Sequence, residues 1–288
     1  MLIMKTKLLA LVILLLIITQ GSLFAQTEDA EFYYNRGRDY LEKGNYNQAM
    51  EDFYQALAIK PDYADAQDGL GEVYYTEGDY DKAELFVLEA KDIRERTLGK
   101  EHPDYVESLN NLGLLYMAMG EYDRAESYCQ EAFTIRERVL GKEHPDYAES
   151  LNNLGLIYMA IGEYDRAKRY LLEALVIWKQ VLGTGHPKYA TFLNNLGAFY
   201  YSIGEYDRAE GCYLEAIAIL REVLGSEHPN YALLLNNLGG FYHAVGNYNR
   251  AENYFLEALA IRKRILSPVH PDYALSMNNL SSLIFYTR

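Results

Sequence analysis

A fixed 42-residue period runs through most of this chain and limits what it can fold into. A glycine, usually in a Leu-Gly dipeptide, is followed by its next copy after 34 residues once and after 42 residues five times, with a serine in the last copy. The series is Gly37, Gly71, Gly113, Gly155, Gly197, Gly239 and Ser281. A regular period of this size predicts a solenoid of supersecondary units, each covering its neighbour's apolar face, in place of one globular core.

Two alanines follow each glycine at fixed distances. The first set lies twelve residues on, at Ala49, Ala83, Ala125, Ala167, Ala209 and Ala251. The second lies seven residues further, at Ala56, Ala90, Ala132, Ala174, Ala216 and Ala258. Small residues let two helices approach closely, and segments such as GEYDRA supply the turn between apolar runs.

These residues resemble the tetratricopeptide repeat, a unit of helix A, a turn and helix B with this glycine and these alanines. Pro61 matches the closing proline of the 34-residue form, and LGKEHPDYAESLNNLGLIY resembles the longer repeat of kinesin light chains and bacterial relatives. The resemblance covers residues 30–288 and implies an all-α, right-handed superhelical solenoid of antiparallel helix pairs. The predicted units are 30–63, 64–105, 106–147, 148–189, 190–231, 232–273 and a half-repeat, 274–288.

The first 25 residues resemble a secretory signal peptide. Lys5 and Lys7 precede an apolar run from Leu8 to Ile18, and small and polar residues lead to Ala25. We therefore expect cleavage after Ala25 and export to the periplasm or the medium. A retained anchor is the alternative that Leu23 leaves open, although the run is far shorter than the roughly 20 residues of a membrane span.

The charge of the remaining chain argues against nucleic-acid binding. Removing Lys5 and Lys7 from 27 basic residues leaves 25 against 41 acidic ones, a net charge of −16. Such a chain repels phosphate backbones, and no basic patch with interleaved aromatic residues appears. The two cysteines, Cys129 and Cys212, are too few for a disulfide framework.

Five histidines recur at one position of the period, at His102, His144, His186, His228 and His270. Packed helices lie roughly 8–10 Å apart, so equivalent side chains in successive units cannot share a zinc ion with nitrogen ligands about 2 Å away. We predict loop packing and capping for them, and capping boxes formed by Asp104 with Glu107 and Asp146 with Glu149. No catalytic residue, metal site or cofactor is predicted, because no nucleophile with a base, phosphate loop or carboxylate pair stands out.

Paired asparagines recur in the middle of the predicted helix A. On a helical wheel, positions 4, 7, 8 and 11 of each unit form the core face, and position 6 points opposite it with positions 2, 9 and 13. Position 6 holds Asn35, Asn111, Asn153, Asn195, Asn237 and Asn279, and the second unit has Gly69. No formal charge occurs in Ser108–Met119, Ser150–Ile161, Phe192–Ile203 or Leu233–Val245. Such a helix is either buried all round or faces a ligand.

Helix A lines the concave side in tetratricopeptide proteins, so the resemblance implies an asparagine ladder on that side. We predict that its amides bind the N–H and C=O groups of an extended peptide. Flanking candidates are Leu114 and Leu156 at position 9, and Met117, Met159, Tyr201 and His243 at position 12. The alternative is that the asparagines are buried between repeats and bond each other or the backbone.

The sequence therefore predicts an exported, non-catalytic adaptor that binds an extended protein or peptide segment. One alternative is a repeat module of a longer or multi-chain signalling or enzymatic assembly whose catalytic part lies outside this chain, and another is a structural spacer that uses the convex surface. The half-repeat carries the apolar segment LSSLIFYTR, with Ser281 in place of the glycine. This segment is predicted to be either a cap or a surface for self-association.

Overall fold

A computed structural model describes residues 29–266 and 270–287, which form α-helices and turns. The predicted signal peptide lies outside this range. The helices are α2 (Ala30–Glu42), α3 (Tyr46–Ile59), α4 (Ala64–Glu77), α5 (Tyr80–Leu98), α6 (Pro103–Met119), α7 (Tyr122–Leu140), α8 (Pro145–Ala160), α9 (Tyr164–Val181), α10 (Pro187–Ser202), α11 (Tyr206–Leu224), α12 (Pro229–Ala244), α13 (Tyr248–Ile265) and α14 (Pro271–Thr287).

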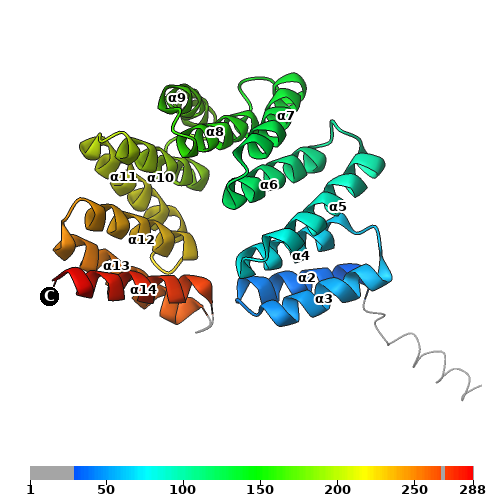
Figure 1. Cartoon of the computed structure of the whole chain (residues 1–288), viewed down its shortest axis with the longest axis horizontal. Helices are drawn as coiled ribbons and strands as arrows, with labels where there is room; N and C mark the ends of the chain where they lie inside the picture. Colours follow the sequence, from blue (N-terminus) through cyan, green and yellow to red (C-terminus); the bar gives the residue numbers. More distant parts are fainter. Residues whose placement is uncertain (1–28, 267–269, 288) are drawn as a thin grey trace, which may run out of the picture.

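Successive helices pack as antiparallel pairs, from α2 with α3 to α12 with α13, and α14 packs against α13 (Figure 1). Each pair stacks on the next, and the chain winds into a superhelix with the first helix of each pair on the inside. The solenoid predicted from the period and the all-α fold implied by the resemblance are therefore confirmed. Within the described ranges, no helix is both long enough and apolar enough to span a bilayer.

The longer units start helix A with a histidine cap followed by proline. Nδ1 of the histidine accepts the N–H of the residue two positions later at 3.1–3.2 Å, in all five copies. The structural role predicted for the histidines is confirmed, but Asp104 and Asp146 are not the caps. They lie in the first helical turn because Pro103 and Pro145 occupy the first helical position, which leaves the cap to the preceding residue. A carboxylate in this turn still favours the helix dipole.

The core face predicted from the helical wheel is confirmed. Leu109, Leu112, Gly113 and Tyr116 are all buried on α6. The recurring glycine is needed because helix B crosses helix A there, and a Cβ at Gly155 would lie 2.7 Å from Cγ of Leu171. In the equivalent place opposite Gly113 lies Cys129, which is a buried core residue, and burial raises its thiol pKa to about 12.

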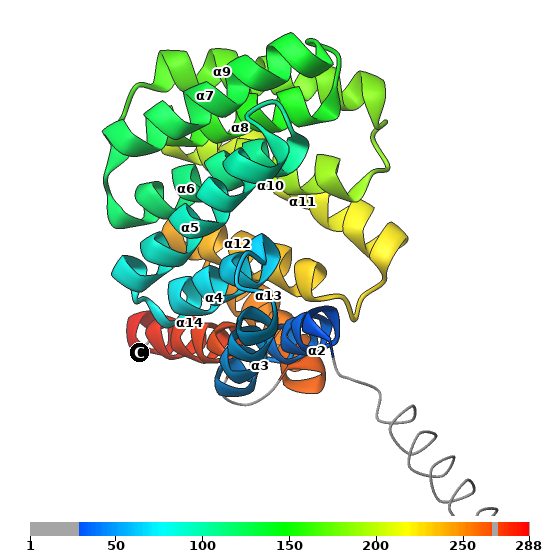
Figure 2. The same ribbon diagram turned by 90° about the vertical axis from the view of Figure 1, so that its right-hand side faces the viewer.

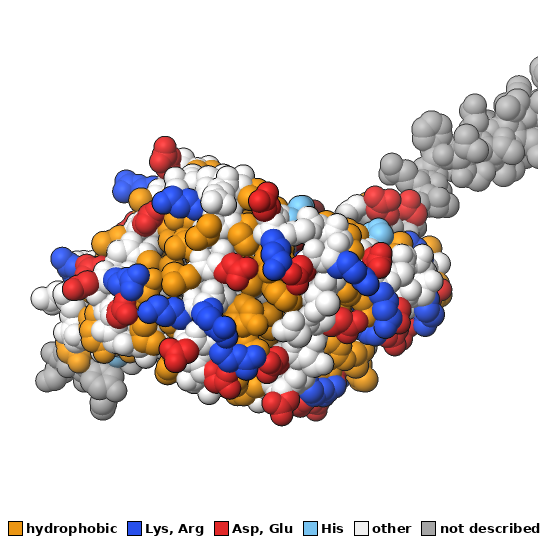
Figure 3. Space-filling view, turned by 90° about the horizontal axis from the view of Figure 1, so that it is seen from above, with side chains coloured by type: hydrophobic (Ala, Val, Ile, Leu, Met, Phe, Trp, Pro, Cys, Tyr) orange, Lys and Arg blue, Asp and Glu red, His pale blue; other side chains and the backbone are white. Residues whose placement is uncertain are grey.

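Tyrosine, glutamate and arginine link successive units beside this core. Tyr242 donates its hydroxyl to Oε1 of Glu210 on α11 at 2.5 Å, and the Arg250 guanidinium also contacts Glu210 at 2.8 Å. The same arrangement joins Tyr116, Glu84 and Arg124. Charged residues of both signs are dispersed over the face in Figure 3, as expected for a solvated outer side.

The two ends of the superhelix meet. The turn between α2 and α3 lies against the residue that precedes α14, with the rings of Tyr46 and His270 6.4 Å apart between centroids. Gly44 packs so closely on His270 that an added Cβ would lie 2.7 Å from its Cδ2 atom. Figures 1 and 2 agree that the start of α14 lies next to α3, so the inner face lies within an almost closed turn.

Candidate functional site

The inner face is built from successive A helices that touch one another, as α6 touches α8 and α8 touches α10. Their asparagines bond across these contacts. The Nδ2 atom of the second asparagine in one unit donates to Oδ1 of the first asparagine in the preceding unit. The bonds run from Asn153 to Asn110 (3.4 Å), Asn195 to Asn152 (3.2 Å), Asn237 to Asn194 (2.9 Å) and Asn279 to Asn236 (2.9 Å). We call these four bonds the rungs.

The rungs correct the expectation that position 6 points outward. Asn153 is buried, whereas Asn111, Asn195, Asn237 and Asn279 are half-buried. A side chain opposite the core of its own pair faces the neighbouring A helix, because A helices lie side by side along the inner face. The described asparagines therefore bond each other between repeats, as the alternative stated. Peptide binding by the donors and acceptors that these amides have left stays a prediction.

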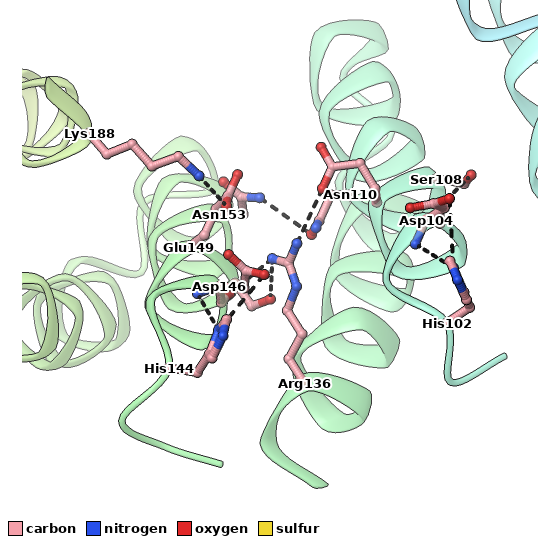
Figure 4. A network of polar contacts seen from close by, with 12 residues as sticks. His102, Asp104, Ser108, Asn110, Arg136, His144, Asp146, Glu149, Asn153 and Lys188 are labelled. Atoms are coloured by element: carbon pink, nitrogen blue, oxygen red, sulfur yellow. Dashed lines mark hydrogen bonds and ion pairs between the residues drawn. The ribbon is translucent and has the colours of Figure 1, made fainter. Parts of the chain in front are cut away.

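Arg136 extends this network toward the helix starts (Figure 4). Its Nη1 atom donates to the Asp146 carbonyl at 2.9 Å and to Ser150 Oγ at 3.1 Å, and Nη2 contacts Glu107 at 3.2 Å. In the alternative orientation of the Asn110 amide, its oxygen accepts bonds of 3.0 Å from both Nη atoms of Arg136 in place of the 3.4 Å bond from Asn153. The polar groups of this inter-unit contact thereby stabilise each other in a buried setting.

A hollow of about 430 Å³ opens on the inner face between α10, α12 and α14, and we call it the C-terminal hollow. Its walls include Asn194, Tyr201, Asn236, Asn237, His243 and Asn279. None of the described residues that line it carries a formal charge. Four of these six residues were predicted from the sequence, namely Tyr201, Asn237, His243 and Asn279.

Sequence reasoning missed part of this hollow. Asn194 and Asn236 occupy the other place of the asparagine pair, and they line the hollow with Ala198 and Gly240. The available signal was position 9, where the small residues Ala198 and Gly240 replace the leucines of earlier units and leave space. Gly240 has no atom within 4 Å of where a Cβ would stand.

The other predicted residues are distributed elsewhere. Met117 and Met159 are half-buried and pack on the core, so they do not border the C-terminal hollow. Asn35 is exposed on α2, and Leu156 is half-buried on α8. Leu114 is 38% exposed and borders a second hollow.

This second, N-terminal hollow of about 290 Å³ lies among α4, α5 and α6. It is lined by Asp68, Glu72, Tyr75, Val87, Asn111 and Leu114, among others. Glu72 pairs with Arg38 of α2, and Asp68 pairs with Arg94 of α5. Burial raises the pKa of the Asp68 carboxyl to about 6, although Arg94 acts in the opposite direction. The two acids were not predicted, since only the asparagine positions were followed along the period.

The chemistry of these residues offers hydrogen bonding and apolar contact. Across residues 29–266 and 270–287, no group of three or more histidine, cysteine or acidic side chains is arranged to hold a metal ion. Burial also raises the pKa of the Cys212 thiol to about 11, which disfavours the reactive thiolate. The fold and the inner face together define the class as a helical-repeat solenoid with an amide-lined inner surface.

Comparison with known proteins places the chain within this class. A family model described as "Tetratricopeptide repeat" matches residues 62–117, 105–180, 151–222, 188–264 and 230–287, and one described as "TPR repeat" matches residues 37–78. The chain therefore belongs to the tetratricopeptide repeat family. A search of curated proteins gave no match.

Solved structures with similar folds include kinesin light chain-like repeats. BtubC (BKLC) from P. vanneervenii is 28% identical, with 77% of this chain and 90% of that chain covered and a TM-score of 0.55. The nearly identical TPR-like repeats of a Podosopora anserina kinesin light chain are 25% identical, with 71% and 97% covered and a TM-score of 0.51. A Rap protein complexed with competence and sporulation factor is similar in fold alone, at 16% identity, 94% and 78% coverage and a TM-score of 0.61.

Proposed function

We propose that this protein is an exported, non-catalytic adaptor that binds an extended peptide segment of a partner protein on its inner face. The observation that carries the proposal is the C-terminal hollow, which is uncharged and lined by asparagine, tyrosine and histidine side chains. An extended peptide presents N–H and C=O groups at regular intervals, and such a surface can satisfy them without a charged partner.

The rungs leave polar capacity for a ligand. An asparagine amide carries two donor hydrogens and an oxygen with two lone pairs, whereas a rung uses one donor of one amide and one lone pair of another. Asn237 and Asn279 stay half-buried while making their rungs. The rungs also hold these side chains in place, which lowers the entropy cost of binding.

Tyr201 adds an apolar surface for side chains of the peptide. It is 38% exposed and lies against Phe241, with 6.0 Å between ring centroids. A similar fold occurs in a Rap protein that was crystallised with a bound factor, which supports a binding role for this kind of scaffold.

Filling the hollow tests the proposal without breaking a rung. Gly240→Leu places at position 9 the residue found there in two other units, Leu114 and Leu156, and open space surrounds the site. Peptides selected from a random decapeptide display library on the wild-type protein should bind this variant at least about tenfold more weakly, a loss of roughly 1.4 kcal/mol. Fluorescence anisotropy with the labelled peptides measures the affinity.

The matched control is Gly211→Leu on the exposed side of α11, which is also a helical glycine in open space. Its peptide affinities should equal those of the wild type. Equal affinities in wild type and Gly240→Leu would refute binding at this hollow, and a library that yields no binders would refute the adaptor proposal itself.

A further inference from the structure

The series of rungs is interrupted between α4 and α6. At the spacing of the four rungs, Asn111 should donate to position 5 of the preceding unit, which is Asp68. No hydrogen bond joins these two side chains in the described chain, and Oδ1 of Asp68 is buried without any hydrogen-bond partner there. A buried acceptor of this kind usually has a donor, so the open rung requires an explanation.

The surrounding helices leave space at this point. Among successive inner helices, α4 and α6 contact each other less than the pairs that carry rungs. Asp68 and Asn111 both line the N-terminal hollow, with Glu72 on the same side. An acceptor, an amide and a second carboxylate therefore converge on one hollow.

The charges and the rim indicate what kind of group fits. Among the described residues, the formally charged ones that line the two hollows are Asp68 and Glu72, both acidic. Arg38 pairs with Glu72, and Arg94 pairs with Asp68. Arg94 also pairs with a third acid, Asp65. The carboxylates thus outnumber the guanidinium groups. At the rim, Tyr75 and Leu114 are 43% and 38% exposed and provide an apolar surface.

We infer that the open rung between Asp68 and Asn111 is a subsite for a basic side chain, lysine or arginine, of the bound peptide. The inference rests on the proposed function and specifies its ligand. The cationic head pairs with the partly exposed carboxylates of Asp68 and Glu72 and donates to the amide oxygen of Asn111, and charge-assisted bonds of this type are the stronger ones. The methylene stem lies on Leu114 and the Tyr75 ring, where a cation also gains from the aromatic face.

The test compares charged and neutral probes of one shape. N-acetyl-arginine amide and N-acetyl-citrulline amide are titrated into ¹⁵N-labelled protein, and the side-chain amide resonances of Asn111 are followed by NMR. We expect saturable shifts with the arginine probe and at least tenfold weaker binding of the citrulline probe. Asp68→Asn should weaken the arginine probe at least tenfold, and it supplies the residue found at this position in later units, so the fold should persist.

Asp65→Asn is the matched control, since it removes the same charge and another Arg94 partner but does not line the hollow. It should keep the affinity of the arginine probe. An equal loss of affinity for the arginine probe in both variants would show a general charge effect and overturn the subsite. A hydrogen bond between Asn111 and Asp68 that persists when the probe is added would also overturn it. Selected decapeptides that bind equally well with citrulline in place of arginine would also overturn it while leaving the adaptor proposal intact.

Discussion

At the scale of single residues, the paired asparagines show how a poor helix former becomes useful. Asparagine competes for backbone hydrogen bonds and costs stability in an isolated helix. Here both members of the pair have a neighbouring helix to bond, since Asn195 donates to Asn152 of the preceding unit and Asn194 accepts from Asn237 of the next. The tertiary contact therefore outweighs the local propensity.

Arg262 presents the opposite case, a buried charge with an incomplete set of partners. It donates to the Asp272 carbonyl and to Ser276, yet its Nε and Nη2 atoms lack hydrogen bonds within the described residues, and burial lowers its pKa. The equivalent Arg136 has Glu107 beside Nη2, whereas the matching place near Arg262 is Leu233.

Leu233→Glu should therefore stabilise the protein, because it adds a second carboxylate beside Arg262, whose Nη2 atom has so far only Oδ2 of Asp272 at 3.6 Å as an ion-pair partner within the described residues. A hydrogen bond to a charged group contributes about 1.5–3 kcal/mol, and Leu233 is 41% exposed, so a gain of about 1 kcal/mol is expected after solvent screening. Urea unfolding at pH 7 measures it. Leu233→Gln provides the uncharged control, and a lower midpoint for the glutamate than for the glutamine variant would contradict this account of Arg262.

At the scale of helices, the rungs add polar bonds to units that one continuous hydrophobic core, from Val87 to Leu283, already joins. Replacing Asn153, Asn195 and Asn237 together with alanine removes three rungs and leaves their acceptors without these donors. Each loss costs about 1–3 kcal/mol for buried groups and less at half-exposed ones.

We expect the triple variant to unfold at a clearly lower temperature than the wild type, because three hydrogen bonds between units are lost. Circular dichroism at 222 nm follows the transition. Replacement of three exposed charged residues, Glu143, Glu222 and Glu252, with alanine is the control and should shift the transition far less. An unchanged transition in the asparagine variant would mean that the rungs contribute nothing to stability.

Helix α14 shows how far the period could predict an element. Its start at Pro271 follows the same histidine and proline signal as the other units. Ser281 replaces the glycine that elsewhere allows helix B to cross, and its hydroxyl bonds the carbonyl of Met277. A helix B could not approach Ser281 as closely as it approaches the glycine of the other units.

The period and the wheel predicted the helix pairs and the core because both follow from repeated apolar spacing. They could not predict the rungs, since a wheel describes one helix and position 6 faces a different one. For the same reason Asp68 escaped notice, because its importance depends on Asn111 of the next unit. Relations between units require knowledge of how the units are stacked.

At the scale of the whole molecule, export is predicted from residues 1–25, which lie outside the described part of the chain. The apolar run from Leu8 to Ile18 and Ala25 predict a mature chain beginning at Gln26. Mass spectrometry of the N-terminal peptide from a periplasmic or culture fraction should find Gln26 first. An intact Met1 in the membrane fraction would refute cleavage, and Ala25→Phe, which disfavours cleavage, should retain the segment.

The meeting of Tyr46 with His270 bears on how many units the protein can carry. All extensively packed helix pairs are close neighbours along the chain, so folding can spread from any unit to the next without long-range search. The contact between Tyr46 and His270 can form only after every unit between these residues has folded. It is also the first contact to be lost when one of these units unfolds. It also depends on the repeat number, since an inserted or deleted 42-residue unit would carry Gly44 away from His270. Solenoids usually gain and lose units freely, whereas the contact between Gly44 and His270 requires the present number of units in this one.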